Sequence, residues 1–166
     1  VSDAQVTPEA IDLLWELNGA TYIHTPATSS GVALHTDATL PAGTHVLSVT
    51  ATDPDGLTDA SQISFIVNGL PSAPMVSISP QPPYTEDDLL AQAAASIDPE
   101  GTFVTYSYEW FKNGVPQGLT TPSISQALTL KDELWTVRVT PSDNIAAGTP
   151  TETSITIQNT PPEITN

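Results

Sequence analysis

The sequence contains no cysteine and very few basic residues, and each shortage excludes a class of function. Without cysteine the chain can form no disulfide, no iron–sulfur or zinc–thiolate site, and no cysteine nucleophile. Only 3 Lys and Arg residues stand against 19 Asp and Glu residues, which gives a formal net charge of −16. Nucleic acids and anionic membrane surfaces are bound by clustered Lys and Arg, so we expect neither as a partner. Such an acidic surface instead attracts cations and repels further copies of the chain.

Long apolar runs are missing as well. No stretch approaches the roughly 18 consecutive apolar residues that a membrane-spanning helix needs, so we expect no membrane insertion. The sequence begins at Val1, with neither an initiator methionine nor a signal-peptide pattern. We therefore expect a processed or excerpted part of a longer chain.

Motifs of catalysis are also absent. The sequence has no G-x-S-x-G turn and no glycine-rich phosphate loop. Asp87 and Asp88 are adjacent carboxylates, and glycoside hydrolysis needs two acids positioned in a cleft. They follow Pro-Pro-Tyr-Thr-Glu, however, in a turn that leads into a strand-like run. The sequence therefore predicts no enzyme.

The sequence does contain an internal repeat. Leu13–Gly19 (LLWELNG) and Tyr108–Gly114 (YEWFKNG) share the pattern W-x-x-N-G, and their tryptophans are 95 residues apart. Further along, His45–Asp53 resembles Glu133–Asp143. Self-similarity at a fixed spacing is the signature of a tandem array. The chain is therefore expected to be a window on such an array.

The repeat predicts modules at residues 1–70 and 71–160, with the start of a third at 161–166. Module two has two strand-like pieces, Val76–Ser79 and Leu89–Ala95, before the part that it shares with module one. Module one has no counterpart of them, so we expect it to be truncated, without strands A and B. The missing strands could belong to the upstream part of the same chain, or a neighbouring chain could donate a strand. The first alternative is favoured, because the missing stretch has the length of ordinary module sequence.

Both modules are predicted to be β. Their runs alternate apolar and polar residues or are rich in Val, Ile, Thr and aromatic residues. Asn18-Gly19 and Asn113-Gly114 are typical two-residue hairpin turns, and the prolines lie between the runs. Pro8–Leu17 alone could form a short helix, but its repeat partner Thr102–Phe111 has a strand pattern, so a strand is predicted in both.

Short strands at intervals of about eight to twelve residues, with a tryptophan on the third strand, are typical of an immunoglobulin-like sandwich. We therefore predict an all-β fold of two tandem immunoglobulin-like β-sandwich modules, the first lacking its N-terminal strands. Trp15 and Trp110 are the expected centres of the two cores.

The motifs D-P-[DE]-G, W-x-x-N-G, the V-x-V-T strand and the N-x-x-P linker resemble the Ig-like and PKD-like repeats of large prokaryotic secreted or cell-surface proteins. The resemblance spans nearly the whole chain, although WELNG and WFKNG replace the PKD hallmark W-D-F-G-D-G. It implies an extracellular or cell-surface location and a role as a stalk, spacer or fibre element. It further implies neighbouring modules of the same longer chain as partners, and homotypic assembly into fibres or a surface layer.

Carboxylates gather around two related turns, Asp53-Pro54-Asp55-Gly56 and Asp98-Pro99-Glu100-Gly101. In a sandwich of this type both loops emerge at the same end, so each module would carry a carboxylate cluster at one pole. The candidate metal ligands are Asp53, Asp55, Asp59, Asp98, Glu100 and Asp143, with Asp3 beside the first group.

Two interpretations of these carboxylates remain open. Calcium takes six to eight oxygen ligands, partly from carboxylates, and a calcium ion at a pole would stiffen the joint between modules. Alternatively, Asp-Pro-Asp-Gly is simply good turn chemistry, since Asp bonds its own backbone and Gly takes positive φ. The histidines His24, His35 and His45 lack any metal-binding spacing, so we interpret them as scattered surface residues.

Aromatic side chains offer a second function. They make up only 6% of the chain, and alternation within strands indicates that at least half of them pack internally. If exposed, they could stack on sugars: Tyr84, Tyr106, Tyr108, Phe111 and Trp135. The sequence therefore predicts a structural repeat segment, with a ligand- or carbohydrate-binding adhesin module or an accessory domain of a secreted enzyme as the alternative.

Overall fold

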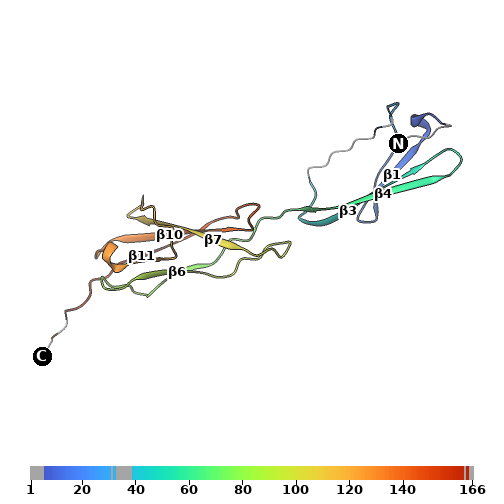
Figure 1. Ribbon diagram of the computed structural model, residues 1–166. Coiled ribbons are helices and arrows are strands. Elements are labelled where there is room, and N and C mark those ends of the chain that lie inside the picture. The colour runs from blue at the N-terminus through green and yellow to red at the C-terminus, as the bar shows by residue number, and fades with distance from the viewer. Residues whose placement is uncertain (1–5, 31, 33–38, 163, 165–166) are drawn as a thin grey trace. The chain divides into compact units, whose positions relative to one another are not determined.

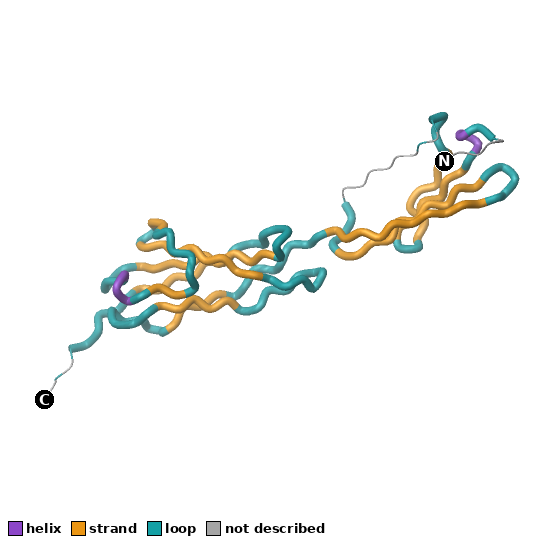
Figure 2. Tube along the Cα trace, in the orientation of Figure 1, coloured by secondary structure: helices purple, strands orange, loops and turns teal. Residues whose placement is uncertain are grey.

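The computed structural model describes residues 6–30, 32, 39–162 and 164 (Figure 1). By backbone contacts the chain divides into two compact units, Val1–Gly69 and Leu70–Asn166, which we call unit 1 and unit 2. In the described residues, each unit consists of strands and loops with one short 3-10 turn (Figure 2). In the described ranges, no helix is long and apolar enough to span a bilayer.

Unit 1 is built on one antiparallel sheet of four strands, in the order β2-β1-β3-β4. Its elements are η1 (Pro8–Ala10), β1 (Asp12–Leu17), β2 (Ala20–Pro26), β3 (Gly43–Thr52) and β4 (Thr58–Val67). The predicted turn joins β1 to β2. Its two residues, Asn18 and Gly19, take φ values of 53° and 78°, as a two-residue hairpin turn requires. The helix-like pattern at Pro8 yields a single 3-10 turn, and the strand predicted from the repeat follows it at Asp12.

One face of the unit 1 sheet is apolar. Its small core consists of Ile11, Leu13 and Ala27, against which Trp15 and Val49 pack. Farther along the same face Ile63 is exposed. Among the described residues of unit 1, no second sheet covers this face.

Unit 2 is a sandwich of two antiparallel sheets, ordered β11-β10-β7-β8 and β5-β6-β9. Its elements are β5 (Val76–Ser79), β6 (Leu89–Ala93), β7 (Thr105–Lys112), β8 (Val115–Pro116), β9 (Ser123–Ile124), η2 (Gln126–Leu128), β10 (Leu134–Ser142) and β11 (Thr151–Thr156). In Figure 1, β6 runs along one side of this unit and β7 and β10 along the other. The predicted all-β, immunoglobulin-like sandwich class is confirmed.

The core of unit 2 lies between its sheets and is centred on two tryptophans. Trp110 and Trp135 meet edge to face, with ring centroids 6.4 Å apart and an interplanar angle of 72°. Each indole N–H has a partner, since Trp110 Nε1 donates to the Thr121 carbonyl at 2.9 Å and Trp135 Nε1 to Glu133 Oε2 at 3.1 Å. The buried aliphatic residues around them are Ile78, Leu89, Ala91, Ile124, Val137, Val139 and Ile157.

Candidate functional site

The carboxylates predicted at the pole of unit 1 shape the turn between β3 and β4. Asp53 Oδ1 accepts a hydrogen bond from the Leu57 N–H at 2.8 Å, and the Asp53 carbonyl accepts one from the Gly56 N–H at 3.0 Å. Gly56 takes φ +85°, as this turn requires. Asp55 and Asp59 are exposed. The described contacts of this loop are therefore those of a turn, and Asp3 lies outside the described residues.

The corresponding carboxylates of unit 2 are buried and hold two loops. Asp98, 7% exposed, accepts hydrogen bonds at Oδ1 from the N–H groups of Glu100 (3.1 Å) and Thr102 (2.9 Å). Asp143, 2% exposed, accepts at Oδ1 from the N–H groups of Ile145 (2.8 Å) and Ala146 (2.7 Å). Both are side-chain-to-backbone contacts of the kind that fix tight loops.

The geometry does not gather the predicted metal ligands into a site. Within the described ranges, no group of three or more His, Asp or Glu side chains lies close enough to hold a metal ion. Asp98 Oδ2 and Glu100 Oε1 are both buried, but two carboxylate oxygens fall well short of six calcium ligands. Calcium binding by Asp53, Asp55, Asp59, Asp98, Glu100 or Asp143 stays a prediction.

The histidines occupy unrelated places. His45 is 5% exposed, so the prediction of a surface position is wrong for this residue. Its Nε2 lies 2.8 Å from the Pro41 carbonyl, its Nδ1 lies 3.0 Å from Asn18 Nδ2, and its ring stacks on Phe65. A proton on Nε2 satisfies both contacts, with the Asn18 amide donating to Nδ1. His45 therefore braces the β1–β2 turn, His24 pairs with Asp12 in an exposed contact, and His35 is outside the described residues.

The adjacent carboxylates of unit 2 also bind backbone. Asp87 Oδ2 accepts a hydrogen bond from the Tyr84 N–H at 2.7 Å, and Asp88 Oδ1 accepts one from the Gln126 N–H at 2.8 Å. The two carboxylates therefore serve different segments rather than one cleft. This arrangement matches the turn interpretation of the sequence.

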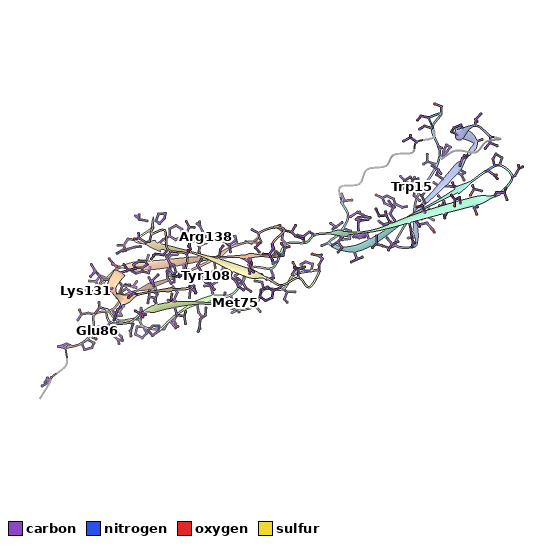
Figure 3. The ribbon with its side chains drawn as sticks, in the orientation of Figure 1. Trp15, Met75, Glu86, Tyr108, Lys131 and Arg138 are labelled. Atoms are coloured by element: carbon purple, nitrogen blue, oxygen red, sulfur yellow. The ribbon has the colours of Figure 1, made fainter. Side chains whose placement is uncertain are left out.

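Charged side chains of unit 2 pair across its strands. Arg138 contacts Glu152 at 2.7 Å and Glu109 at 3.1 Å, and it lies over the Phe111 ring. These contacts raise the pKa of Arg138, with the hydrogen bond to Glu152 as the main cause. Arg138 and Tyr108, on the neighbouring strands β10 and β7, are both labelled in Figure 3.

Glu133 is the centre of a second, more enclosed pairing. Its carboxylate accepts hydrogen bonds from the Leu130 N–H at 2.9 Å and the Trp135 indole, and it lies 3.2 Å from Lys112 Nζ. Burial raises the pKa of Glu133, but these donors outweigh burial and bring the pKa below its ordinary value. The ionised carboxylate therefore ties the segment after η2 to β10.

The aromatic residues proposed for sugar stacking are mostly engaged. Trp135 is 1% exposed, so the structure rules it out as a surface platform. The Tyr106 hydroxyl accepts a hydrogen bond from the Ser96 N–H at 2.7 Å and donates to the Ala94 carbonyl at 3.3 Å. Phe111 is partly covered by Arg138, and Tyr84 is 37% exposed.

A groove nevertheless opens beside two of these tyrosines. Its volume is about 740 Å³, within the range of about 300–1,000 Å³ that is usual for ligand sites. Its lining includes Ala93, Ala95, Ser96, Phe103, Tyr106 and Tyr108. Phe103 is 80% exposed, although it belongs to no predicted site. The sequence contains one sign of this groove, a weak strand pattern after Asn113-Gly114. There unit 2 has VPQGLTTP, whereas unit 1 has the strand sequence ATYIHTP after Asn18-Gly19.

Comparisons with known proteins give no family. No protein-family profile and no curated protein sequence matches the chain. Among solved structures, the chain is similar to the fibronectin(III)-like modules of Clostridium thermocellum CbhA, at 15% identity and a TM-score of 0.35. That match covers 96% of this chain and 83% of that chain. A TM-score this low carries no argument about function.

Proposed function

We propose that the chain is a structural repeat segment, a stalk, spacer or fibre element, of an extracellular or cell-surface protein. Its neighbours would be further modules of the same longer chain. The recurrence of one four-strand arrangement supports this proposal, since β2-β1-β3-β4 in unit 1 has the same connectivity as β8-β7-β10-β11 in unit 2. The net charge of −16 fits a solvated surface that resists aggregation.

The observation that carries the proposal is how the chain enters and leaves unit 2. At the entrance, the Ser72 N–H donates to the Ile97 carbonyl at 2.9 Å, and the Ile97 N–H donates to Ser72 Oγ at 2.8 Å. At the exit, the Gln158 N–H donates to the Pro83 carbonyl at 2.8 Å. Both ends of the module are therefore fastened to its body.

A second contact reinforces the exit. The hydroxyls of Thr85 and Thr160 lie 2.9 Å apart, and Tyr84 and Gln158 form a parallel bridge. Because the bridged segments run in the same direction, tension applied at Thr160 loads these hydrogen bonds together in shear. Resistance to tension of this kind is what a spacer between other modules requires.

Stretching single molecules of the full chain between its two ends tests this function. We expect unit 2 to unfold in one abrupt step, because its core and both fastenings must fail together. Residues 72–160, once extended, span about 300 Å at 3.3–3.6 Å per residue, less the folded length of the unit. Gradual lengthening of unit 2 without such a step would refute a tension-bearing role.

A further inference from the structure

Strand β7 is fully paired on one side and barely paired on the other. Along its whole length, Thr105–Lys112, it pairs with β10. On its other side β8 pairs only with Phe111 and Lys112. Most of the second edge of β7 therefore lacks a neighbouring strand in the described part of unit 2.

The directions of the backbone N–H and C=O groups of β7 show which residues have no partner on the side away from β10. The Trp110 N–H donates to the Leu119 carbonyl at 3.3 Å, and the Trp110 carbonyl accepts from the Gln117 N–H at 2.9 Å, so both groups face away from β10. Backbone groups alternate in direction along a strand, so those of Tyr108 and Tyr106 face the same way. No described backbone or side-chain group pairs with them there. This open edge, Tyr106–Tyr108, is the feature on which the inference rests.

Unit 1 shows how the same edge looks when it is occupied. The repeat spacing of 95 residues places Ile11 and Leu13 at the two tyrosine positions. In unit 1 the longer strand β2 continues past both, since Thr25 pairs with Leu13 and the Ala27 N–H donates to the Ile11 carbonyl at 3.0 Å. In unit 2 the chain leaves this path after Leu119 and turns toward β9.

The groove lies along the open edge. It is lined by Tyr106 and Tyr108, by the exposed Phe103, and by Ala95 and Ser96 of the segment that follows β6. Ser96 Oγ is buried and has no hydrogen-bond partner among the described residues. Unpaired backbone donors and acceptors at every second residue, next to a partly apolar groove, are features that an extended peptide recognises by strand addition.

We propose that the open edge Tyr106–Tyr108 and the groove beside it bind an extended polypeptide segment of another protein, which pairs with β7 as β2 pairs with β1. Every second side chain of the segment enters the groove. Among the described residues no Lys or Arg lines the groove, and the chain carries a net charge of −16, so the segment is neutral or basic. A second copy of this chain brings the same negative charge and is a poorer occupant.

A suitable probe is a capped synthetic peptide with the sequence of residues 20–27, ATYIHTPA. This sequence contains β2, which pairs with β1 in unit 1 at the positions that correspond to the open edge. It is added to the full chain, and amide hydrogen exchange is followed residue by residue. We expect exchange of the Tyr108 N–H to slow about tenfold when the free peptide is at nine times its Kd. The Ser107 N–H faces β10 and is already paired, so its exchange stays unchanged and serves as the internal control.

Two modified peptides test strand pairing without altering the protein. Methylation of the peptide nitrogen at Thr25 removes the donor that faces the edge, so we expect affinity to fall at least tenfold. Methylation at His24, whose N–H faces away from the edge, leaves affinity within about threefold. On the protein side, F103A weakens binding severalfold, whereas I97A, a similarly exposed residue outside the groove, does not.

Three results would overturn the proposal. The first is unchanged exchange of the Tyr108 N–H at saturating peptide. The second is equal binding of the two methylated peptides, which would show contact without strand pairing. The third is protection of Tyr108 that rises with protein concentration in the absence of peptide, which would make a second copy the occupant. None of these results bears on the unfolding step of unit 2, so the proposed structural function is tested separately.

Discussion

Replacing Gly148 with alanine should destabilise unit 2 out of proportion to the size of the change. Gly148 is buried, and its N–H donates to the Pro141 carbonyl at 2.9 Å. A Cβ at this position would lie 2.2 Å from the Pro71 carbonyl oxygen and 3.0 Å from Pro141 Cγ. Pro71 cannot retreat easily, because the next residue, Ser72, is hydrogen-bonded to Ile97.

The magnitude follows from two opposing terms. Overpacking of a rigid site costs about 1–3 kcal/mol. Alanine also reduces the conformational freedom of the unfolded chain, which favours the variant by about 0.4–1 kcal/mol. Because the added Cβ would clash with backbone at 2.2 Å, the overpacking cost belongs in the upper half of that range, about 2–3 kcal/mol, and the net loss of about 1–2.6 kcal/mol corresponds to a decrease in Tm of roughly 4–21 °C for a unit of this size.

Thermal unfolding of the full chain, followed by tryptophan fluorescence and calorimetry, measures this shift. Thr149→Ala is the matched control, because Thr149 is the exposed neighbour of Gly148 and its change introduces no clash. A Tm for G148A equal to or above that of the wild type would refute the close approach of Pro71. The entrance of unit 2 would then not be fastened as described.

The remaining predictions concern charged groups. Asp143→Ala removes the acceptor of two loop N–H groups and should lower the free energy of unfolding in urea by about 1–3 kcal/mol. Asp55→Ala, at an exposed turn position, is the control and should lower it by less than about 0.5 kcal/mol. Because the pKa of Glu133 is lowered on folding, its stabilising contribution is present above its ordinary pKa of 4.5 and is lost as pH falls through the folded value. Unfolding between pH 6 and pH 3 should therefore show a steeper loss of stability for wild type than for Glu133→Gln. Calcium at the carboxylate turns would raise Tm, and Asp98→Asn combined with Glu100→Gln would abolish that rise, whereas a Tm indifferent to both calcium and chelator would contradict the predicted calcium site.

Much of the fold could be predicted because local signals and the repeat agreed. Asn113 and Gly114 adopt φ values of 48° and 81°, as an Asn-Gly hairpin turn demands, and this turn fixes the register of the flanking strands. Trp110 is fully buried, as its place in the repeat predicts. At Pro8, where local pattern and repeat disagreed, the structure keeps a short 3-10 turn and then the predicted strand.

The candidate sites were less predictable because they depend on tertiary surroundings. Asp98 was found from its turn motif, but its burial comes from the packing of the loop and could not be read from the motif. His45 was expected on the surface and is buried because Phe65 and Pro41 enclose it. The groove lies where, in the described part of unit 2, no strand continues along β7 after Leu119. A missing strand is hard to predict, because it shows in the sequence only as a weak strand pattern.

The most direct test of the structural role compares two variants that each lose one hydroxyl. Thr85→Val removes the contact across the exit of unit 2, and Thr136→Val removes the 2.8 Å contact with Ser154 between β10 and β11. Each should cost about 0.5–1.5 kcal/mol at equilibrium, so the two variants should be similarly stable in solution. In single-molecule stretching, our account predicts a clearly lower unfolding force for Thr85→Val and a nearly unchanged force for Thr136→Val. Equal unfolding forces for the two variants would contradict the claim that the exit of unit 2 is built to withstand tension.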